Sequence, residues 1–306
     1  YPPAGIANGK AYEMMSCFEG MLEYYRATGD EKYKENVQIF YDKLIEQEIT
    51  LLGSGGANKP FNLGPGIGEQ WNHTAYEQTN PDIDLMMETC VTVYWMKLCH
   101  QLFRLTGNSK IADQLEISAY NAQIGAIKPD GKFFEYFPRF NGTRNPKVNY
   151  SFNIDGFDLS CCTANGPTGL ALFASGIYMK TENGLAINYY VPGKVTLEDF
   201  SLVVDTDYPV TGRVNLKVET KEKKQMELMF RVPSWTKAFT IRINDEDVTN
   251  IDNGYAKVDR LWQSGDLISL DIDMTCKVFD APLGSNRLGD DFAAVMRGPI
   301  LLARDR

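Results

Sequence analysis

Hydrophobic positions recur every three to four residues in the first part of the chain and every two residues in the rest. Residues 9–28 carry apolar side chains one helical turn apart, which predicts an amphipathic helix. The same spacing predicts helices over residues 31–48, 85–105, 109–124 and 167–179. The helix over 85–105 is apolar on nearly every side, so we expect it to be buried.

A short repeat joins two pairs of these helices. Residues 26–32 read RATGDEK, and residues 104–110, 78 positions later, read RLTGNSK. Repeated helical hairpins indicate an array or ring of helix pairs. Five helices are too few to close such a ring, and the chain starts without methionine. We therefore expect an N-terminal part of the helical domain to lie outside this sequence, and these residues alone to be inactive.

Beyond Gly184 the spacing becomes two residues, which predicts β-strands. The alternating segments are residues 185–190, 214–218, 226–232, 240–243 and 267–272. Turn residues separate them at intervals typical of a sandwich. The sequence therefore predicts an α plus β multidomain protein, with helical hairpins over residues 1–180 and an antiparallel β-sandwich over 181–306. The second domain need not end within this sequence.

Composition narrows the classes of partner. The chain has 306 residues, a mass of 34.5 kDa and 43% hydrophobic residues, as is ordinary for a globular protein. Its net charge of −9 argues against nucleic acid as a partner. No apolar run approaches the roughly 18 residues of a membrane span, and no phosphate-binding glycine loop is present. The compartment, cytoplasm or periplasm, and the oligomeric state, including a homo-oligomer, stay open.

The spacing of the cysteines indicates a functional site at residues 161–162. Cys161 and Cys162 are adjacent, a spacing that makes a strained disulfide, and they lie just ahead of a predicted helix whose N-terminus favours thiolates. The alternative is a chance pair with one buried and one exposed thiol. Cys17, Cys99 and Cys276 are expected to be buried core thiols.

Glu88 and Cys90 stand at the start of the apolar helix, and one carboxylate with three cysteines is a ligand set for tetrahedral zinc. Residues two apart point about 200° away from each other on a helix. If both bind one ion, residues 88–90 must lie outside regular helix. The alternative for Glu88 is an exposed carboxylate favoured by the helix dipole. Glu69, in a glycine-rich loop, would be left for acid–base chemistry, the alternative being a solvated loop glutamate.

The chain resembles glycoside hydrolase family 127, the β-L-arabinofuranosidases, and their relatives. The resemblance rests on Gly68-Glu69, Glu88-Thr89-Cys90, Cys161-Cys162-x-x-Asn165 and supporting segments such as 131–136 and 230–235. It implies an (α/α)6 barrel followed by β-sandwich domains. Residues 1–180 would then be the C-terminal part of a barrel catalytic domain.

The resemblance also implies roles for individual residues. Zn2+ would be held by Glu88, Cys90, Cys161 and Cys162. Cys161 would be the nucleophile and Glu69 the general acid/base of a retaining hydrolase acting on a glycoside or oligosaccharide from plant glycans. Tyr136 and Lys10 would line the sugar; much of the family has histidine at the position of Lys10. The alternatives are a non-catalytic carbohydrate-binding or scaffold protein with a structural zinc, and a related glycosidase for a different sugar.

Overall fold

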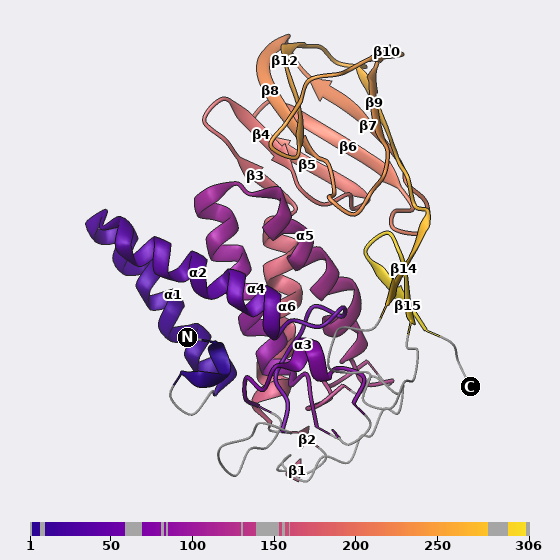
Figure 1. Cartoon of the computed structure of the whole chain (residues 1–306). Coiled ribbons are helices and arrows are strands. Elements are labelled where there is room, and N and C mark those ends of the chain that lie inside the picture. The colour runs from indigo at the N-terminus through magenta and orange to yellow at the C-terminus, as the bar shows by residue number, and fades with distance from the viewer. Residues whose placement is uncertain are drawn as a thin grey trace.

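The structure is a computed structural model that describes residues 2–6, 10–58, 69–80, 83, 85–129, 131–138, 153–154, 157–158, 160–280 and 293–303. Gly68, one of the residues that carry the family resemblance, lies outside this set. Among the described residues, the regular structure up to Gly176 consists of helices and one short hairpin, and strands follow from Tyr178 (Figure 1). In Figure 1 strands β3 to β13 stand above the helices, whereas β14 and β15 lie beside them and β1 and β2 below them. The α plus β organisation that the sequence predicted is confirmed.

The helices lie close to where the hydrophobic spacing placed them. Their bounds are Pro3–Gly5 for the 3-10 helix η1, Ala11–Thr28 for α1, Glu31–Gln47 for α2, Thr74–Glu77 for α3, Thr89–Thr106 for α4, Ser109–Ser118 for α5, Ala119–Gln123 for the π-helix η2 and Cys161–Gly176 for α6. The largest difference is α6, which begins at Cys161 rather than at Pro167. No helix among the described residues is long and apolar enough to cross a membrane.

The sequence repeat forms the same turn twice. Gly29 ends α1 with a φ of 73°, and Gly107 ends α4 with a φ of 64°, a left-handed conformation that glycine adopts without strain. In the next position, Asp30 and Asn108 each accept a hydrogen bond from the backbone N–H two residues later. The repeat thus encodes two helical hairpins, α1–α2 and α4–α5.

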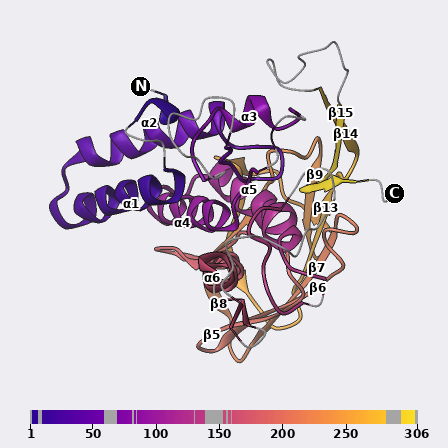
Figure 2. The ribbon, with the colours of Figure 1, turned by 90° about the horizontal axis from the view of Figure 1, so that it is seen from below.

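Helix α4 is the centre of the helical part. Its buried residues lie on every side of the helix, from Thr89 to Phe103, as the all-round apolar sequence predicted. It packs against α1, α5 and α6, and Figure 2 shows these helices gathered around it. The position of both ends of α4 is therefore set by its neighbours.

Two sheets make up the strand-rich part. One has the order β10-β9-β13-β7-β6-β5 and the other β11-β12-β8-β4-β3, all antiparallel except the parallel pair of β4 and β8. A single cluster of buried side chains draws on both sheets, so they pack face to face. The strands are Tyr178–Lys180 (β3), Gly184–Ile187 (β4), Gly193–Leu197 (β5), Phe200–Thr206 (β6), Arg213–Thr220 (β7), Lys224–Arg231 (β8), Phe239–Ile243 (β9), Glu246–Asp247 (β10), Ile251–Asp252 (β11), Tyr255–Trp262 (β12) and Leu267–Ile272 (β13).

Two smaller sheets complete the structure. Strands Asn153–Ile154 (β1) and Phe157–Asp158 (β2) pair just before α6. Strands Cys276–Asp280 (β14), Ala293–Arg297 (β15) and Ile300–Leu302 (β16) form a sheet that returns to the helices. Asn121 of η2 donates from Nδ2 to the carbonyl of Pro299 at 2.8 Å. The end of the described chain is thereby attached to the helical part.

A buried ionic cluster fastens the sandwich to α5. Arg231 at the end of β8 has no exposed surface, and its guanidinium pairs with Asp113 and, at 2.8 Å, with Glu116. Tyr208 donates a hydrogen bond to the same Glu116 carboxylate at 2.7 Å. Removing one member of such a buried set leaves the others charged and unsolvated.

We expect Arg231→Met to lower the free energy of unfolding by about 3–5 kcal/mol, because Asp113 and Glu116 would stay buried without their cation. Urea unfolding of the full-length protein measures this. The control is Arg242→Met, which breaks a solvent-exposed pair with Asp247 and should change stability little. Equal unfolding midpoints for the two variants would contradict a structural role for the cluster.

Candidate metal and acid–base site

The N-terminal ends of α4 and α6 meet and bring four ligand groups together. Glu88 is the residue before α4, Cys90 lies in the first turn of α4, and Cys161 and Cys162 open α6. The ligand atoms of these four residues all lie within 4.8 Å of one another. The structure therefore assembles the four residues that the sequence singled out for a metal.

The sequence predicted that residues 88–90 lie outside regular helix if Glu88 and Cys90 bind one ion. The prediction is right for Glu88 and wrong for Cys90, which lies in α4. Met87 has a φ of 59°, so the chain turns sharply just before the helix. Glu88 follows in an extended conformation with a ψ of 135°, and the helix starts at Thr89. The turn swings the Glu88 side chain toward the face that carries Cys90, so only one of the two residues has to leave the helix.

The spacing of the ligand atoms fits a tetrahedral ion. Sulfur ligands about 2.3 Å and oxygen ligands about 2.1 Å from zinc lie about 3.6–3.8 Å from one another. The Cys90 and Cys162 sulfurs are 3.5 Å apart. Glu88 Oε1 lies 3.6 Å from the Cys162 sulfur and 3.9 Å from the Cys161 sulfur. These separations match the edges of a coordination tetrahedron.

The charges at the cluster call for a cation. Burial, with the nearby charges of Glu69 and Cys161, raises the pKa of Glu88 well above its usual value. Its Oε2 atom is buried and finds no hydrogen-bond partner among the described residues. The Cys162 and Cys90 thiols, and then the Tyr136 hydroxyl, hold the pKa of the Cys161 thiol well below its usual range. A cation bound between these groups would remove the cost of burying their charges.

Helix α6 also supplies a side chain that contacts the cluster. Ser160 caps the helix by accepting a hydrogen bond from the N–H of Thr163, and Asn165 lies inside α6, two residues before Pro167, where the sequence predicted the helix to begin. Asn165 donates from Nδ2 to the Cys90 sulfur at 3.2 Å. Its position four residues after Cys161, on the same helix face, was the signal available in the sequence.

Glu69 reaches the site through short backbone bridges. Gln70 pairs with Lys10 on one side and with Ala57 on the other, and Ala57 also pairs with Met86, two residues before Glu88. The Glu69 carbonyl accepts a hydrogen bond from the N–H of Ala11 at 2.9 Å. The loop that carries Glu69 is thus tied both to the start of α1 and to the segment that leads into α4.

Both oxygens of the Glu69 carboxylate are occupied. Lys10 pairs with Oε2, and Tyr136 donates its hydroxyl to Oε1 at 2.5 Å. Burial lowers the pKa of Lys10, but the hydrogen bond and charge of Glu69 outweigh it and raise that pKa. Burial and the bond to Glu69 hold the pKa of Tyr136 well above its usual value, so the phenol keeps its proton. Lys10 and Tyr136 were expected to contact the sugar. In the structure both side chains contact the carboxylate of Glu69, the expected acid/base.

Tyr136 links Glu69 to the thiols. Its hydroxyl oxygen lies 3.7 Å from the Cys161 sulfur as well as 2.5 Å from Glu69. Its carbonyl accepts a hydrogen bond from the N–H of Thr89 at 3.0 Å, the first residue of α4. The tyrosine is consequently anchored to the helix end that carries Glu88 and Cys90.

The six cysteines differ in exposure. Cys161 is exposed, whereas its cluster partners Cys90 and Cys162 are buried. Cys99 is a buried core thiol, as expected. Cys17 and Cys276 are exposed, so the expectation that they are core thiols was wrong. Cys17 lies on the outward face of α1 and Cys276 on the outward face of β14. Other residues of these elements supply the apolar side chains that face inward.

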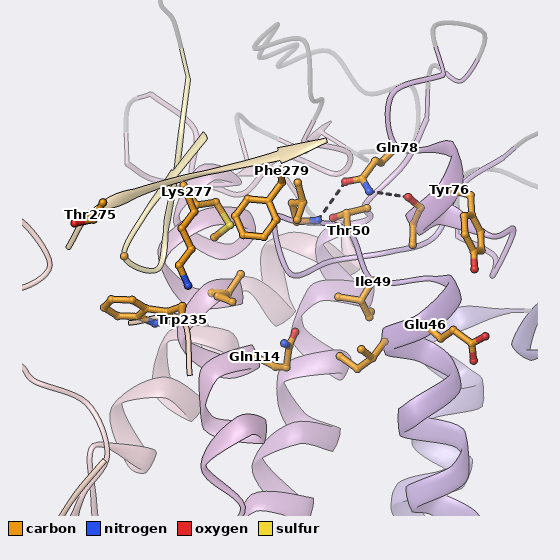
Figure 3. Close-up of a pocket in the computed structure, with 16 residues that line it drawn as sticks. Glu46, Ile49, Thr50, Tyr76, Gln78, Gln114, Trp235, Thr275, Lys277 and Phe279 are labelled. Atoms are coloured by element: carbon orange, nitrogen blue, oxygen red, sulfur yellow. Dashed lines mark hydrogen bonds between the residues drawn. The ribbon is translucent and has the colours of Figure 1, made fainter. Parts of the chain in front are cut away.

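A cavity of about 340 Å³ opens elsewhere, between the C-terminal end of α2, α5 and β14 (Figure 3). Trp235 and Phe279 form part of its wall, and Gln78, another lining residue, accepts a hydrogen bond from the N–H of Leu51 at 3.2 Å. None of the residues that line it belongs to the thiol cluster or contacts Glu69. It is distinct from the candidate site.

Two models of known families match the chain. The family described as "Beta-L-arabinofuranosidase, GH127 catalytic domain" matches residues 6–175, and "Beta-L-arabinofuranosidase, GH127 middle domain" matches residues 184–274. The chain belongs to glycoside hydrolase family 127. The first match contains all of the residues discussed above for the site, and the second covers most of the sandwich.

Individual relatives of this family cover nearly the whole chain. A non-reducing end β-L-arabinofuranosidase from Bifidobacterium longum subsp. longum is 24% identical over 98% of this chain and 46% of its own length. A solved GH127 β-L-arabinofuranosidase from Geobacillus stearothermophilus T6 is 24% identical with a TM-score of 0.76, covering 96% of this chain and 46% of that one. A solved GH127 β-arabinofuranosidase has a TM-score of 0.80 at 24% identity, covering 96% and 47%. The chain spans about half the length of these relatives.

We expect the purified full-length protein to contain one tetrahedrally bound metal ion per chain, measured by elemental analysis. Cys162→Ala should lose this ion and melt at a lower temperature, because binding free energy at such a site contributes to folding. Cys17→Ala, which removes an exposed thiol on α1, is the control and should keep both the ion and the melting temperature. A Cys162→Ala protein with undiminished metal would contradict the assignment.

Proposed function

We propose that this chain carries the reacting residues of a retaining glycoside hydrolase, with Cys161 as nucleophile and Glu69 as general acid/base. The proposed substrates are β-L-arabinofuranosides or similar sugars of plant glycans. The names of the relatives support the sugar class, and the local geometry supports the roles. Lys10 and Tyr136 are proposed to contact the sugar in addition to Glu69.

The distance between the two reacting groups is the observation that carries the proposal. The Tyr136 hydroxyl touches both, 2.5 Å from Glu69 Oε1 and 3.7 Å from Cys161 Sγ, so these two atoms can be at most about 6.2 Å apart. Retaining enzymes hold their two groups about 5–5.5 Å apart, and inverting enzymes need about 6.5–9.5 Å to admit a water. This upper limit lies below the inverting range, which supports the retaining assignment.

Exposure and charge support Cys161 as the nucleophile. It is the exposed thiol of the cluster, whereas Cys90 and Cys162 are buried and cannot be reached by a sugar. Its neighbours hold the pKa of its thiol low, and the N-terminus of α6 favours negative charge at the same position. A thiolate is therefore available at neutral pH.

The reaction would proceed in two displacements. The Cys161 thiolate attacks the anomeric carbon, the bond from that carbon to the leaving oxygen breaks, and Glu69, which must enter this step protonated, gives its proton to that oxygen. Glu69, now a carboxylate, takes a proton from water. The resulting hydroxide attacks the same carbon, the carbon–sulfur bond breaks, and the thiolate is restored. The net change is hydrolysis with retention of configuration.

The metal proposed for the cluster is Zn2+, held by Glu88, Cys90, Cys161 and Cys162. When bound, it supplies positive charge that keeps the thiols deprotonated. The chain contributes the shape of the site: Asn165 donates to the Cys90 sulfur, and the Tyr136 hydroxyl contacts both the Cys161 sulfur and Glu69.

The architecture of the two domains is also a proposal. We infer that residues 1–180 are the C-terminal part of an (α/α)6 barrel and residues 181–306 a β-sandwich domain. The two helical hairpins, joined by the repeated turn, support the barrel. The TM-scores of 0.76 and 0.80 with structures of the family support the overall fold.

We expect Cys161→Ala and Glu69→Ala to abolish turnover of an aryl β-L-arabinofuranoside by the full-length protein. Removing the general acid/base should cost at least about 10²–10⁴-fold in kcat, and removing the nucleophile should leave only background hydrolysis. Initial rates of phenol release measure both. Cys17→Ala is the matched control with wild-type rates, and wild-type rates from either site variant would refute the mechanism.

Lys10 favours a second candidate, a glycosidase of the same mechanism with another sugar specificity. Its ammonium pairs with Glu69 and stands where much of the family has histidine, so the sugar hydroxyls would meet a different donor. We expect Lys10→His to alter the ranking of aryl glycosides in a panel of pentosides and hexosides. An unchanged ranking would contradict a specificity role for Lys10.

A further inference from the structure

Glu48 is a buried carboxylate that belongs neither to the thiol cluster nor to the contacts of Glu69. It follows the last turn of α2 and has no exposed surface. A carboxylate at a helix C-terminus is disfavoured by the helix dipole, and burying it costs further free energy. Burial raises the pKa of Glu48 to about 7. Such a group persists only where donors compensate for its burial.

The donors come from one segment of the loop that follows Glu69. The N–H groups of Asn72, His73 and Thr74 donate to the Glu48 carboxylate at 3.2, 3.0 and 3.0 Å. The Thr74 hydroxyl donates as well, at 3.1 Å. The backbone of His73 is in the left-handed conformation, with a φ of 55°. Three successive N–H groups therefore point toward the same carboxylate. The backbone here forms an anion-binding nest, and Glu48 is its anion.

This nest is connected to Glu69 in sequence and in space. It begins three residues after Glu69, and the side chain of Asn72 donates to the carbonyl of Ala57 at 2.5 Å. Ala57 in turn donates its N–H to the carbonyl of Gln70 at 2.9 Å. Glu48 thus fixes the downstream end of the segment on which Glu69 stands.

A second branch of the network leads to Glu88. The Thr74 hydroxyl accepts a hydrogen bond from the N–H of Gly56 at 3.0 Å, and the Gly56 carbonyl accepts one from the N–H of Met87 at 2.8 Å. Met87 immediately precedes Glu88. A single buried carboxylate is therefore linked to the loop of the acid/base and to the turn that aims the metal ligand.

We propose that Glu48 is a positioning residue, whose carboxylate holds residues 72–74 and thereby sets the place of the Glu69 carboxylate relative to Cys161. The inference rests on the proposed roles of Glu69 and Cys161. In Glu48→Gln an amide N–H2 replaces one carboxylate oxygen and faces a backbone N–H, so at least one donor of the nest loses its acceptor. The loop then settles in a different position.

A displaced acid has a characteristic kinetic signature. Protonation by Glu69 matters greatly for a basic leaving group and little for a stable phenolate, because the latter departs without a proton. Misplacement of a catalytic group by about 1 Å can cost on the order of 10²-fold in rate. A positioning defect therefore grows with the basicity of the leaving group, whereas a loss of folded protein lowers the rates of all substrates by one factor.

The test compares kcat/KM for 4-methoxyphenyl and 2,4-dinitrophenyl β-L-arabinofuranosides in the full-length, metal-loaded protein. We expect Glu48→Gln to lower the value for the methoxyphenyl substrate by about 10–100-fold and that for the dinitrophenyl substrate by less than about 3-fold. Metal content should be unchanged. Equal losses for the two substrates, or no loss, would overturn the proposal.

Three further variants make the outcome decisive. Glu116→Gln, which alters a buried carboxylate of the Arg231 cluster, is the matched control and should change both substrates by the same factor. Glu69→Ala should show the steep leaving-group dependence; if it does not, the proposed function fails rather than the role of Glu48. If Glu48→Gln does not fold, Thr74→Val, which removes one donor of the nest, decides alone: a leaving-group-dependent loss supports the proposal and a uniform one overturns it.

Discussion

The meeting of the N-terminal ends of α4 and α6 is the constraint on which the site depends. It confines three sulfurs and a carboxylate within 4.8 Å of one another. The partial positive charge of the two helix ends favours the anionic forms of these groups. A bound cation would favour them further, and the separations of 3.5, 3.6 and 3.9 Å between ligand atoms are close to those expected around a tetrahedral ion. Packing of α4 against α6 and coordination would then reinforce each other.

The rest of the site is attached to this centre by backbone contacts rather than by regular secondary structure. Tyr136 is held by Thr89 at the start of α4, and Glu69 by the bridges through Gln70 and Ala57. A loop with so few regular hydrogen bonds needs other fixed points. In the proposed arrangement the buried carboxylate of Glu48, the residue that follows the last turn of α2, provides one. The proposed reacting groups then depend on the ends of three helices, although Glu69 itself is in none.

The sequence predicted those features that depend on local chemistry. Helical hairpins followed from apolar spacing and from the glycines at 29 and 107, and the cluster of one carboxylate and three thiols from the types of residue and the family resemblance. The start of α6 was placed too late, because Pro167 is a common first-turn residue, whereas Ser160 supplies the cap that begins the helix. Glu48 gave no signal, since its role depends on a loop that only the folded chain brings to it.

The central claim is that the sulfur of Cys161 attacks the sugar, and trapping the intermediate tests it most directly. In a full-length Glu69→Ala variant, a dinitrophenyl β-L-arabinofuranoside can still form the glycosyl-enzyme, but the missing base slows its hydrolysis. Peptide mapping by mass spectrometry should then find one anhydropentose on the peptide that contains Cys161, on its sulfur. A burst of dinitrophenolate with the sugar on a carboxylate, or with unmodified Cys161, would contradict the account.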